Sequence, residues 1–377
     1  MSEMLFWLAG ACLTYVYVGY PVLVWALAAL RPRPAARAGF LPSVSVLVCA
    51  HDEEARIDAR LQNLLALDYP RHRLEILLGS DGSRDATVAR ARRHPGVTVV
   101  DFPQRRGKPA VLNDLARIAH GEVLVLGDVR QRYEPDTVRA LVAPLAAADV
   151  GAVSGELFLT EREEGGAVGR GVGVYWRYEK FIRSQESRLD STVGATGAVY
   201  AVRRELFEPL PADAILDDVL LPMRIVRRGY RVLFEPAARA YDIAAATNRE
   251  EFTRKVRTIA GNFQMFARER WLLSPLRNRL WAQTISHKGL RLASPLFLLV
   301  AFLANAALLD VTLYRWTFAA QALFYSAALG GYLLRDARRV PVLTVPYVFC
   351  LLNYATAVAF SRFVRRRQHV TWERASA

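Results

Sequence analysis

The feature that most constrains this chain is a run of 27 uncharged residues near its start, from Met4 to Leu30. A helix needs about 20 apolar residues to cross the hydrocarbon core of a bilayer. The run is too long for the apolar core of a signal peptide, and no basic segment precedes it. Arg31-Pro32-Arg33-Pro34 follows it in place of a small-residue cleavage site. We therefore expect residues 1–31 to form a retained membrane anchor rather than a leader that is removed.

The other end of the 377-residue chain is also apolar. Three further uncharged runs predict about three transmembrane helices within residues 292–362, ahead of a basic tail at 363–377. These runs are Ala293–Leu309, Trp316–Leu334 and Val340–Ser361. Between the two apolar ends, the composition is that of a soluble domain.

Apolar and basic side chains alternate between Trp271 and Arg291, just before the first of these runs. This pattern favours an amphipathic helix that lies in the membrane interface over residues 271–291. An ordinary amphipathic core helix is the alternative interpretation.

The charges around the N-terminal run predict which side of the membrane the domain faces. The uncharged Ser2 and the acidic Glu3 stand directly before the run, whereas the basic residues Arg31, Arg33 and Arg37 follow it. Positively charged residues favour the cytoplasmic side, so we expect a multi-pass protein of the cell (inner) membrane with its central domain in the cytoplasm. If three spans precede the basic tail, the tail lies on the outer side, which the same rule disfavours. The side of the membrane on which the tail lies is therefore left open.

The formal net charge of +14 does not indicate nucleic-acid binding, because no RNA- or DNA-binding module is legible and many arginines flank the apolar runs. Contact with anionic membrane lipid and an anionic substrate explains the charge better. The three cysteines, Cys12, Cys49 and Cys350, have no disulfide or metal-site spacing.

Apolar, β-branched segments alternate with helical patterns in the central region. This alternation predicts an α/β domain over residues 42–270, with a mostly parallel sheet covered by helices on both faces. The expected strands are Val44–Cys49, Leu74–Gly79, Val97–Phe102, Glu122–Gly127, Ala152–Ser154, Val199–Val202 and Arg231–Phe234. The expected helices are Glu53–Leu67, Asp85–Arg93, Pro109–Ala119, Val174–Arg188, Asp218–Arg228 and Arg249–Glu269.

Acidic residues recur where these strands end. Asp52 and Glu53 follow the first strand, Asp81 the second, and Asp128 the fourth. Ligands of open α/β sheets bind at the carboxyl ends of the strands, and carboxylates there suit a substrate that carries phosphate and a divalent metal. Each acid taken alone is also consistent with a helix cap or a turn.

Three other groups of residues complete a candidate site. Arg105 to Lys108 precede a helix that contains Asn113, a place where a diphosphate could bind. One of the adjacent carboxylates Asp217 and Asp218 could act as a general base. Arg254 and Arg257 lie three apart and could also meet a diphosphate, although a solvated pair of charges is equally consistent with that spacing.

The order of these motifs resembles the membrane-bound family 2 glycosyltransferases, the group of cellulose, chitin and hyaluronan synthases. The resemblance implies a nucleotide-sugar-binding domain of the GT-A type over residues 42–270. By position, Ala50, Asp52 and Glu53 resemble the first nucleotide-binding motif and Asp81 the second. Lys108 and Asn113 match the diphosphate side of the site.

The same resemblance assigns the remaining candidates. Asp128 matches the first acid of the Asp-x-Asp metal motif, which implies Mg²⁺ or Mn²⁺ as cofactor. Gly194, Thr196 and Gly197 resemble the acceptor-side loop. Asp217 and Asp218 fall on the family's acidic pair, and this makes Asp218 the expected base of an inverting single displacement.

Two departures from the family pattern change what is expected. Arg130 stands where the second metal acid belongs, so either the metal loses a ligand or Arg130 replaces part of its charge. The Gln-x-x-Arg-Trp signature of processive synthases survives only as Arg257, with Thr258 in the place of the tryptophan. We therefore expect one or a few sugar additions rather than a long polymer.

The resemblance predicts transfer of a hexosyl or N-acetylhexosaminyl group from a nucleoside-diphosphate sugar, with a UDP-sugar as the expected donor. The acceptor would be a glycan or a lipid-linked molecule at the cytoplasmic membrane face, in cell-surface or exopolysaccharide synthesis, with export or synthase proteins as possible partners. Two alternatives stay open: a transferase that uses polyprenyl phosphate as acceptor, and a non-catalytic nucleotide-sugar-binding scaffold of another synthase.

Overall fold

The structure is a computed structural model that describes residues 1–36, 39–160, 168–243, 248–334 and 340–367. The chain divides into two compact units. Among the described residues, the sheet unit comprises 30–36, 39–160 and 183–243, and the helical unit comprises 1–29, 168–182, 248–334 and 340–367. Each unit is described by itself.

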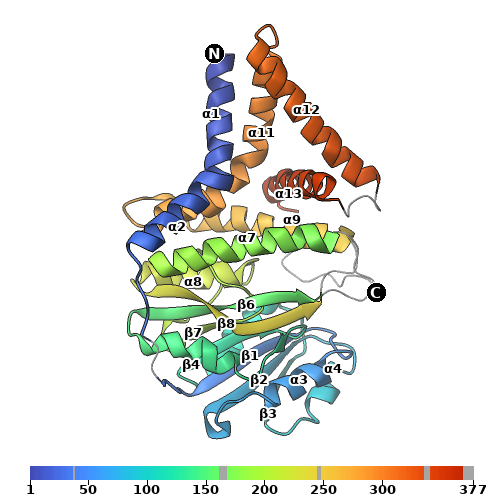
Figure 1. The fold of residues 1–377 in the computed structure, drawn as a ribbon. Coiled ribbons are helices and arrows are strands. Elements are labelled where there is room, and N and C mark those ends of the chain that lie inside the picture. The colour runs from blue at the N-terminus through green and yellow to red at the C-terminus, as the bar shows by residue number, and fades with distance from the viewer. Residues whose placement is uncertain (37–38, 161–167, 244–247, 335–339, 368–377) are drawn as a thin grey trace. The chain divides into compact units, whose positions relative to one another are not determined.

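Eight strands form one sheet within the described part of the sheet unit, in the order β3-β2-β1-β4-β7-β6-β8-β5 (Figure 1). The first four in this order are parallel, and β7 runs antiparallel between β4 and β6. The mixed sheet with its helices confirms the predicted α/β class. The strands are β1 (Val44–Ala50), β2 (Leu74–Asp81), β3 (Val97–Phe102), β4 (Val123–Asp128), β5 (Arg132–Tyr133), β6 (Val150–Thr160), β7 (Tyr200–Arg203) and β8 (Arg231–Ile243).

Helices pack on both faces of this sheet. On one face, alternate residues of β1 such as Val46 and Val48 join Leu61 in a single apolar core. On the other face, Gly79 lets α5 approach β2, because a Cβ atom at this glycine would lie 2.3 Å from Val111 Cγ1. The helices of this unit are α3 (Ile57–Leu65), α4 (Thr87–Ala91), α5 (Lys108–Ile118), α6 (Thr137–Val142), α8 (Asp217–Arg227) and the last turns of α7 (Val168–Leu189).

The register of the parallel strands places several candidate residues at one edge of the sheet. Cys49 of β1 lies opposite Asp128 of β4, and Ala50 lies opposite Ser80 of β2. The segments that leave these three strands therefore start side by side at their carboxyl ends, where ligands of α/β sheets bind.

The helical unit contains the apolar ends of the chain. Among the described residues, three helices are long and apolar enough to cross a membrane: Ser2–Leu30, Trp281–Ala306 and Pro341–Val364. They coincide with the segments predicted as the N-terminal anchor and as two of the C-terminal spans, and their crossing of a membrane stays a prediction. The third predicted span, Trp316–Leu334, falls in the 22-residue helix α12, which is not one of these three. The described helices of this unit are α1 (Ser2–Thr14), α2 (Tyr20–Leu30), α9 (Asn248–Arg268), α10 (Trp281–Thr284), α11 (Leu290–Ala306), α12 (Thr312–Leu333) and α13 (Pro341–Val364), together with the start of α7.

The prediction of one interfacial helix over residues 271–291 is wrong. The 3₁₀ helix Arg270–Leu273 ends at Ser274, which is extended with φ −97° and ψ 118°. Pro275 explains this break, because the residue before a proline disfavours the helical region. From Trp281 the chain is helical up to Ala306 and forms one of the candidate spans.

One of the basic side chains that suggested an interface has an acidic partner in the structure. Within the helical unit, Arg291 pairs with the buried carboxylate of Glu179. The Nε2 atom of His287 lies 3.0 Å from the other oxygen of Glu179. Arg291 thus has an internal acidic partner, which the sequence pattern alone does not show.

Candidate active site

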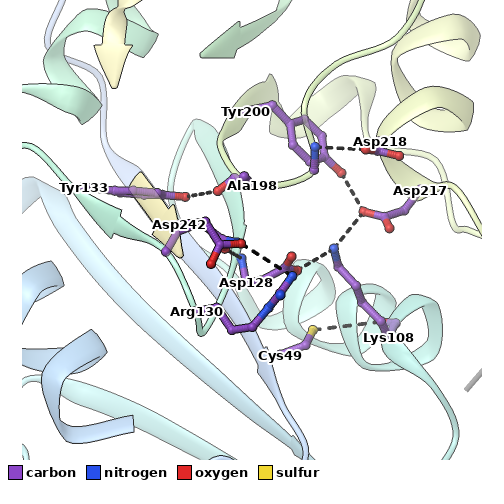
Figure 2. Close-up of polar contacts among 12 residues, drawn as sticks. Cys49, Lys108, Asp128, Arg130, Tyr133, Ala198, Tyr200, Asp217, Asp218 and Asp242 are labelled. Carbon is purple, nitrogen blue, oxygen red and sulfur yellow. Dashed lines mark hydrogen bonds and ion pairs between the residues drawn. The ribbon is translucent and has the colours of Figure 1, made fainter. Parts of the chain in front are cut away.

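Lys108 lies at the centre of a charged cluster at the carboxyl end of β4. Its Nζ atom lies 2.9 Å from Oδ1 of Asp128 and 3.3 Å from Oδ2 of Asp217 (Figure 2). The side chain of Lys108 is 10% exposed, and those of Asp128 and Asp217 are 24% and 9% exposed. The structure therefore brings together three of the predicted site residues, which come from α5, β4 and α8.

The backbone before Lys108 explains how this side chain reaches the cluster. Gly107 has φ +89°, a conformation that favours glycine, and it turns the chain into the first residue of α5. Pro109 then occupies an early position of the helix, where its missing N–H costs no hydrogen bond.

The cluster keeps Lys108 positively charged. Burial lowers the pKa of Lys108, but the carboxylates of Asp128 and Asp217 outweigh it and raise the pKa above its ordinary value. The nearby Cys49 thiol has its pKa raised by burial. A thiol of this kind stays protonated and inert at neutral pH, so Cys49 is not a nucleophile.

Asp218 lies beside this cluster and is held by the acceptor-side loop. Gly197 donates its N–H to Oδ2 of Asp218 over 2.9 Å, and Ala195 donates its N–H to the Asp218 backbone carbonyl over 2.7 Å. A Cβ atom at Gly197 would lie 2.8 Å from Oδ2 of Asp218, so only glycine permits this approach. The predicted loop residues Gly194, with φ +89°, and Thr196 belong to the same turn.

The environment of Asp218 adjusts its acidity toward neutral pH. Burial, helped by the neighbouring charge of Asp217, raises the pKa of Asp218 to about 6, while Lys108, Arg183 and the Gly197 N–H act in the opposite direction. A general base works best when its pKa lies near the operating pH. Asp218 is thus suited to accept a proton from a hydroxyl group.

The two adjacent aspartates have different surroundings. Oδ2 of Asp217 receives a hydrogen bond from the Tyr200 hydroxyl over 3.1 Å in addition to its contact with Lys108. Burial and the nearby carboxylates of Asp217 and Asp218 raise the pKa of Tyr200 well above its ordinary value, so the tyrosine is a neutral donor. Asp217 therefore organises the cluster, and Asp218 is the better candidate for proton transfer.

Asp81 shapes the basic loop that leads to Lys108. Its carboxylate accepts the N–H of Arg106 over 2.6 Å and that of Gly107 over 2.9 Å. Asp81 and Asp128 therefore both contact this segment, since Gly107 is bonded to the first and Lys108 to the second, and Asp217, the chain neighbour of Asp218, also contacts Lys108. The contact of Asp81 with a nucleoside stays a prediction.

The first predicted nucleotide-binding motif forms a tight turn after β1. Asp52 adopts φ 52°, a left-handed conformation that aspartate and asparagine tolerate better than most residues. Its carboxylate accepts the N–H of Arg84 over 2.8 Å, and the N–H of Glu53 is donated to the Thr87 hydroxyl over 2.7 Å. Ala50, the last residue of β1, is fully buried. The turn is thus tied to the segment after β2.

Two other predicted donor-binding residues lie outside the Lys108 cluster. The amide of Asn113 donates to the Leu210 carbonyl and accepts the Leu210 N–H, each over 2.8 Å. It therefore anchors the segment before α8. Arg257 lies on α9 in the helical unit. Donor binding by either residue stays a prediction.

Asp242 and Gln131, which belong to none of the sequence motifs, support Asp128. Gln131 Oε1 accepts the Asp128 N–H over 3.1 Å, and Gln131 Nε2 donates to Oδ2 of Asp242 over the same distance. Arg130, in the place of the second metal acid, lies 3.6 Å from that oxygen (Figure 2). Asp242 lies close to the end of β8. The sequence pattern predicts an end of this strand at Phe234, so Asp242 falls outside the predicted strand.

The residues around Asp128 fit a metal ion that arrives with a diphosphate. Among the described residues, no group of three or more His, Cys, Asp or Glu side chains is arranged to hold a metal. Mg²⁺ and similar ions, however, are commonly held by one or two carboxylates together with substrate phosphates and waters. Asp128, which is partly exposed and lies next to the Lys108 ammonium, can supply one such carboxylate.

The fold and this site define a glycosyltransferase of the GT-A type. A family model described as glycosyl transferase family group 2 matches residues 131–360, and the model of glycosyl transferase family 2 matches residues 45–210. The chain belongs to the family 2 glycosyltransferases.

Curated relatives and a solved structure agree with this assignment. The chain is 28% identical over 243 residues to the probable glycosyltransferase YdaM of Bacillus subtilis, covering 59% of this chain and 56% of the relative. It is 25% identical over 219 residues to a beta-monoglucosyldiacylglycerol synthase of Trichormus variabilis, covering 55% of this chain and 47% of the relative. The match thus spans about half the length of these relatives.

The structural neighbour is similar over nearly the whole chain. It is a mannosyltransferase from Pyrobaculum calidifontis solved in complex with GDP-mannose and Mn²⁺. The TM-score is 0.72 at 26% identity, and the match covers 96% of this chain and 99% of the neighbour.

Proposed function

We propose that this chain is an inverting, membrane-bound glycosyltransferase that transfers a hexosyl group from a nucleoside-diphosphate sugar, with Asp218 as its general base. The observation that carries the proposal is the arrangement of Asp218 beside the Lys108–Asp128–Asp217 cluster. A base and a cation for the leaving diphosphate are the two groups that a single displacement at the anomeric carbon requires.

The chemistry follows from these two groups. Asp218 accepts the proton of the acceptor hydroxyl, and the acceptor oxygen forms a bond to the anomeric carbon as the bond from that carbon to the diphosphate breaks. Lys108 lies where its charge can offset the negative charge that develops on the leaving diphosphate. A divalent ion held by Asp128, when bound with the donor, supplies additional charge neutralisation.

The donor and acceptor classes are supported by the comparisons. The Pyrobaculum neighbour binds GDP-mannose, so GDP-mannose is the first donor to test, and the UDP-sugars expected from the family resemblance come next. The named relatives include a lipid glycosyltransferase and a poly-β-1,6-N-acetylglucosamine synthase of Staphylococcus aureus, which support a lipid or glycan acceptor. We place the reaction at the cytoplasmic membrane face, because basic residues follow the N-terminal span.

The test uses the full chain purified in detergent, a panel of GDP- and UDP-sugars with membrane-lipid and glycan acceptors, and release of free nucleoside diphosphate as the signal. Reactions with added Mn²⁺, added Mg²⁺ and a chelator establish the metal requirement. Asp218→Asn is expected to lower turnover by about 10²- to 10⁴-fold and to leave nucleotide affinity nearly unchanged, because it removes a base and no nucleotide contact. The exposed Asp213→Asn is the matched control.

The pH profile is a second measurement. Because the pKa of Asp218 is raised to about 6, activity should fall as the pH drops through about 6 and the base becomes protonated. If no donor is turned over by the native protein, the scaffold alternative replaces this proposal. Equal losses of turnover and nucleotide binding in Asp218→Asn would assign Asp218 to the donor site instead.

A further inference from the structure

The acceptor-side loop is held by a cation that none of the sequence motifs includes. Arg183 lies in the part of α7 that belongs to the sheet unit, and its Nη1 atom donates to the hydroxyl of Thr196. The same threonine donates its N–H to the buried hydroxyl of Ser154 over 2.9 Å. Thr196 is thus fixed from its side chain by α7 and from its backbone by β6.

This anchored threonine is directly followed by the residue that binds Asp218. Gly197 donates its N–H to Oδ2 of Asp218 over 2.9 Å, and the absence of a side chain permits that approach. A displacement of Thr196 therefore moves the hydrogen-bond donor of Asp218.

Arg183 also acts on Asp218 through its charge. Its guanidinium is bonded to a neutral hydroxyl at Thr196, and this partner does not cancel the positive charge. That charge opposes the effect of burial on the pKa of Asp218.

We propose that Arg183 is a positioning residue for Asp218, which fixes the Thr196–Gly197 turn and supplies a positive charge, in addition to that of Lys108, that favours the ionised Asp218 carboxylate. The proposal rests on the proposed function in one respect, the assignment of Asp218 as the base. Arg183 itself contacts the loop and is not assigned a contact with substrate.

The other groups that face Asp218 come from three elements and do not replace Arg183. Asp217 of α8 is negative and makes ionisation of Asp218 less favourable. Lys108 of α5 is positive and also favours ionisation of Asp218, but it is bonded to Asp128 and Asp217 and not to the turn that holds Asp218. Tyr200 of β7 is neutral, because its pKa is raised well above the ordinary value.

The experiment compares the pH dependence of kcat/KM in four full-length proteins. Arg183→Gln removes the charge, Arg183→Lys keeps it, and Arg188→Gln is the matched control, since Arg188 is an exposed arginine of the same helix bonded to Gln185. We expect the acid limb of Arg183→Gln to move upward by about 0.5 to 1 pH unit, the direction that follows when an opposite charge is removed from a carboxylate. Arg183→Lys should return the limb most of the way to the native position, and Arg188→Gln should leave it unchanged.

A second readout does not depend on turnover. Asp218 has a raised pKa in the folded protein, so its ionisation weakens folding as the pH rises from about 4 to about 6, and Asp218→Asn removes this loss. The melting temperature of the native protein should therefore fall relative to that of the Asp218→Asn variant as the pH rises through this window. In an Arg183→Gln background, the same relative fall should continue to higher pH. This difference reports on Asp218 even if Asp218→Asn stays active and the base assignment fails.

Two results would overturn the inference. One is an acid limb of Arg183→Gln that coincides with the native limb. The other is an equal shift in Arg183→Gln and Arg183→Lys, which would show that the positive charge is not what matters. If Arg183→Gln does not fold, Thr196→Val tests the anchor alone, and a native pH profile and turnover in that variant would equally contradict the proposal.

Discussion

The charged cluster makes a quantitative prediction about Lys108→Met. The substitution leaves two carboxylates, 9% and 24% exposed, without the ammonium group that lies 3.3 and 2.9 Å from them. Removal of one partner from a buried ion pair costs about 3 to 5 kcal/mol. Because Asp128 is about a quarter exposed, we expect the lower end, about 3 kcal/mol at pH 7.5. For a unit of this size that corresponds to a melting temperature lower by about 6 to 12 °C.

The loss should depend on pH with a definite sign. Burial raises the pKa of Asp218 to about 6, and Lys108 acts in the opposite direction. Removal of Lys108 therefore makes the ionised Asp218 carboxylate less favourable at pH 7.5 but not at pH 5, where this group is protonated, so the deficit of Lys108→Met should shrink between pH 7.5 and pH 5. Thermal unfolding of the detergent-solubilised protein, followed by intrinsic fluorescence at both pH values, measures the difference. Arg117→Met on the same helix is the control, because this arginine is 74% exposed and its pair with Asp114 should contribute less than about 1 kcal/mol.

A loss of 1 kcal/mol lowers the melting temperature by about 2 to 4 °C in a unit of this size. A melting temperature of Lys108→Met at pH 7.5 that lies within about 2 °C of the native value would refute the reasoning. So would a deficit that grows on acidification. The first outcome would mean that Lys108 does not hold Asp128 and Asp217 together in the folded protein, and the second that its charge does not favour ionisation of Asp218.

Two further predictions concern the loop that holds Asp218. Gly197→Ala should lower turnover by about 10- to 100-fold with little change in nucleotide affinity, because its Cβ would lie 2.8 Å from Oδ2 of Asp218. Gly39→Ala, where the added Cβ meets open space, is the control, and native turnover in Gly197→Ala would contradict the geometry. Tyr133→Phe should cost about 1 to 2 kcal/mol in thermal unfolding, because it removes a buried 2.9 Å hydrogen bond to the Ala198 carbonyl. An unchanged melting temperature would show that this bond contributes nothing net.

The predictability of the fold differed between the two halves of the sheet. The parallel strand β1 is buried at every residue and reads as one apolar run, so Val44–Cys49 was predicted to within one residue of the observed end at Ala50. The strands β6 and β8 are longer than predicted. Their outer parts, such as Glu156 and Arg239, pair with each other but are only partly buried, and therefore carry polar side chains. An apolar-run criterion cannot detect strands of this kind.

The candidate site shows a similar division. Asp128, Lys108 and Asp218 were each predicted from their place in a motif, because short motifs specify which residue types occupy the ends of strands and helices. Asp242 and Arg183 belong to no such motif. They reach the site only because β8 and α7 bring them next to Gln131 and Thr196.

The sequence by itself determined the apolar segments toward both ends of the chain, the alternation of strands and helices, and the family to which the chain belongs. These properties depend on local hydrophobicity, periodicity and short motifs, which are present in any stretch of the chain. Only the tertiary structure decided that Lys108 lies between Asp128 and Asp217, and that Asp218 sits against Gly197 with a pKa of about 6. Contacts and charges between distant segments depend on strand order, register and burial, and a sequence pattern does not contain them.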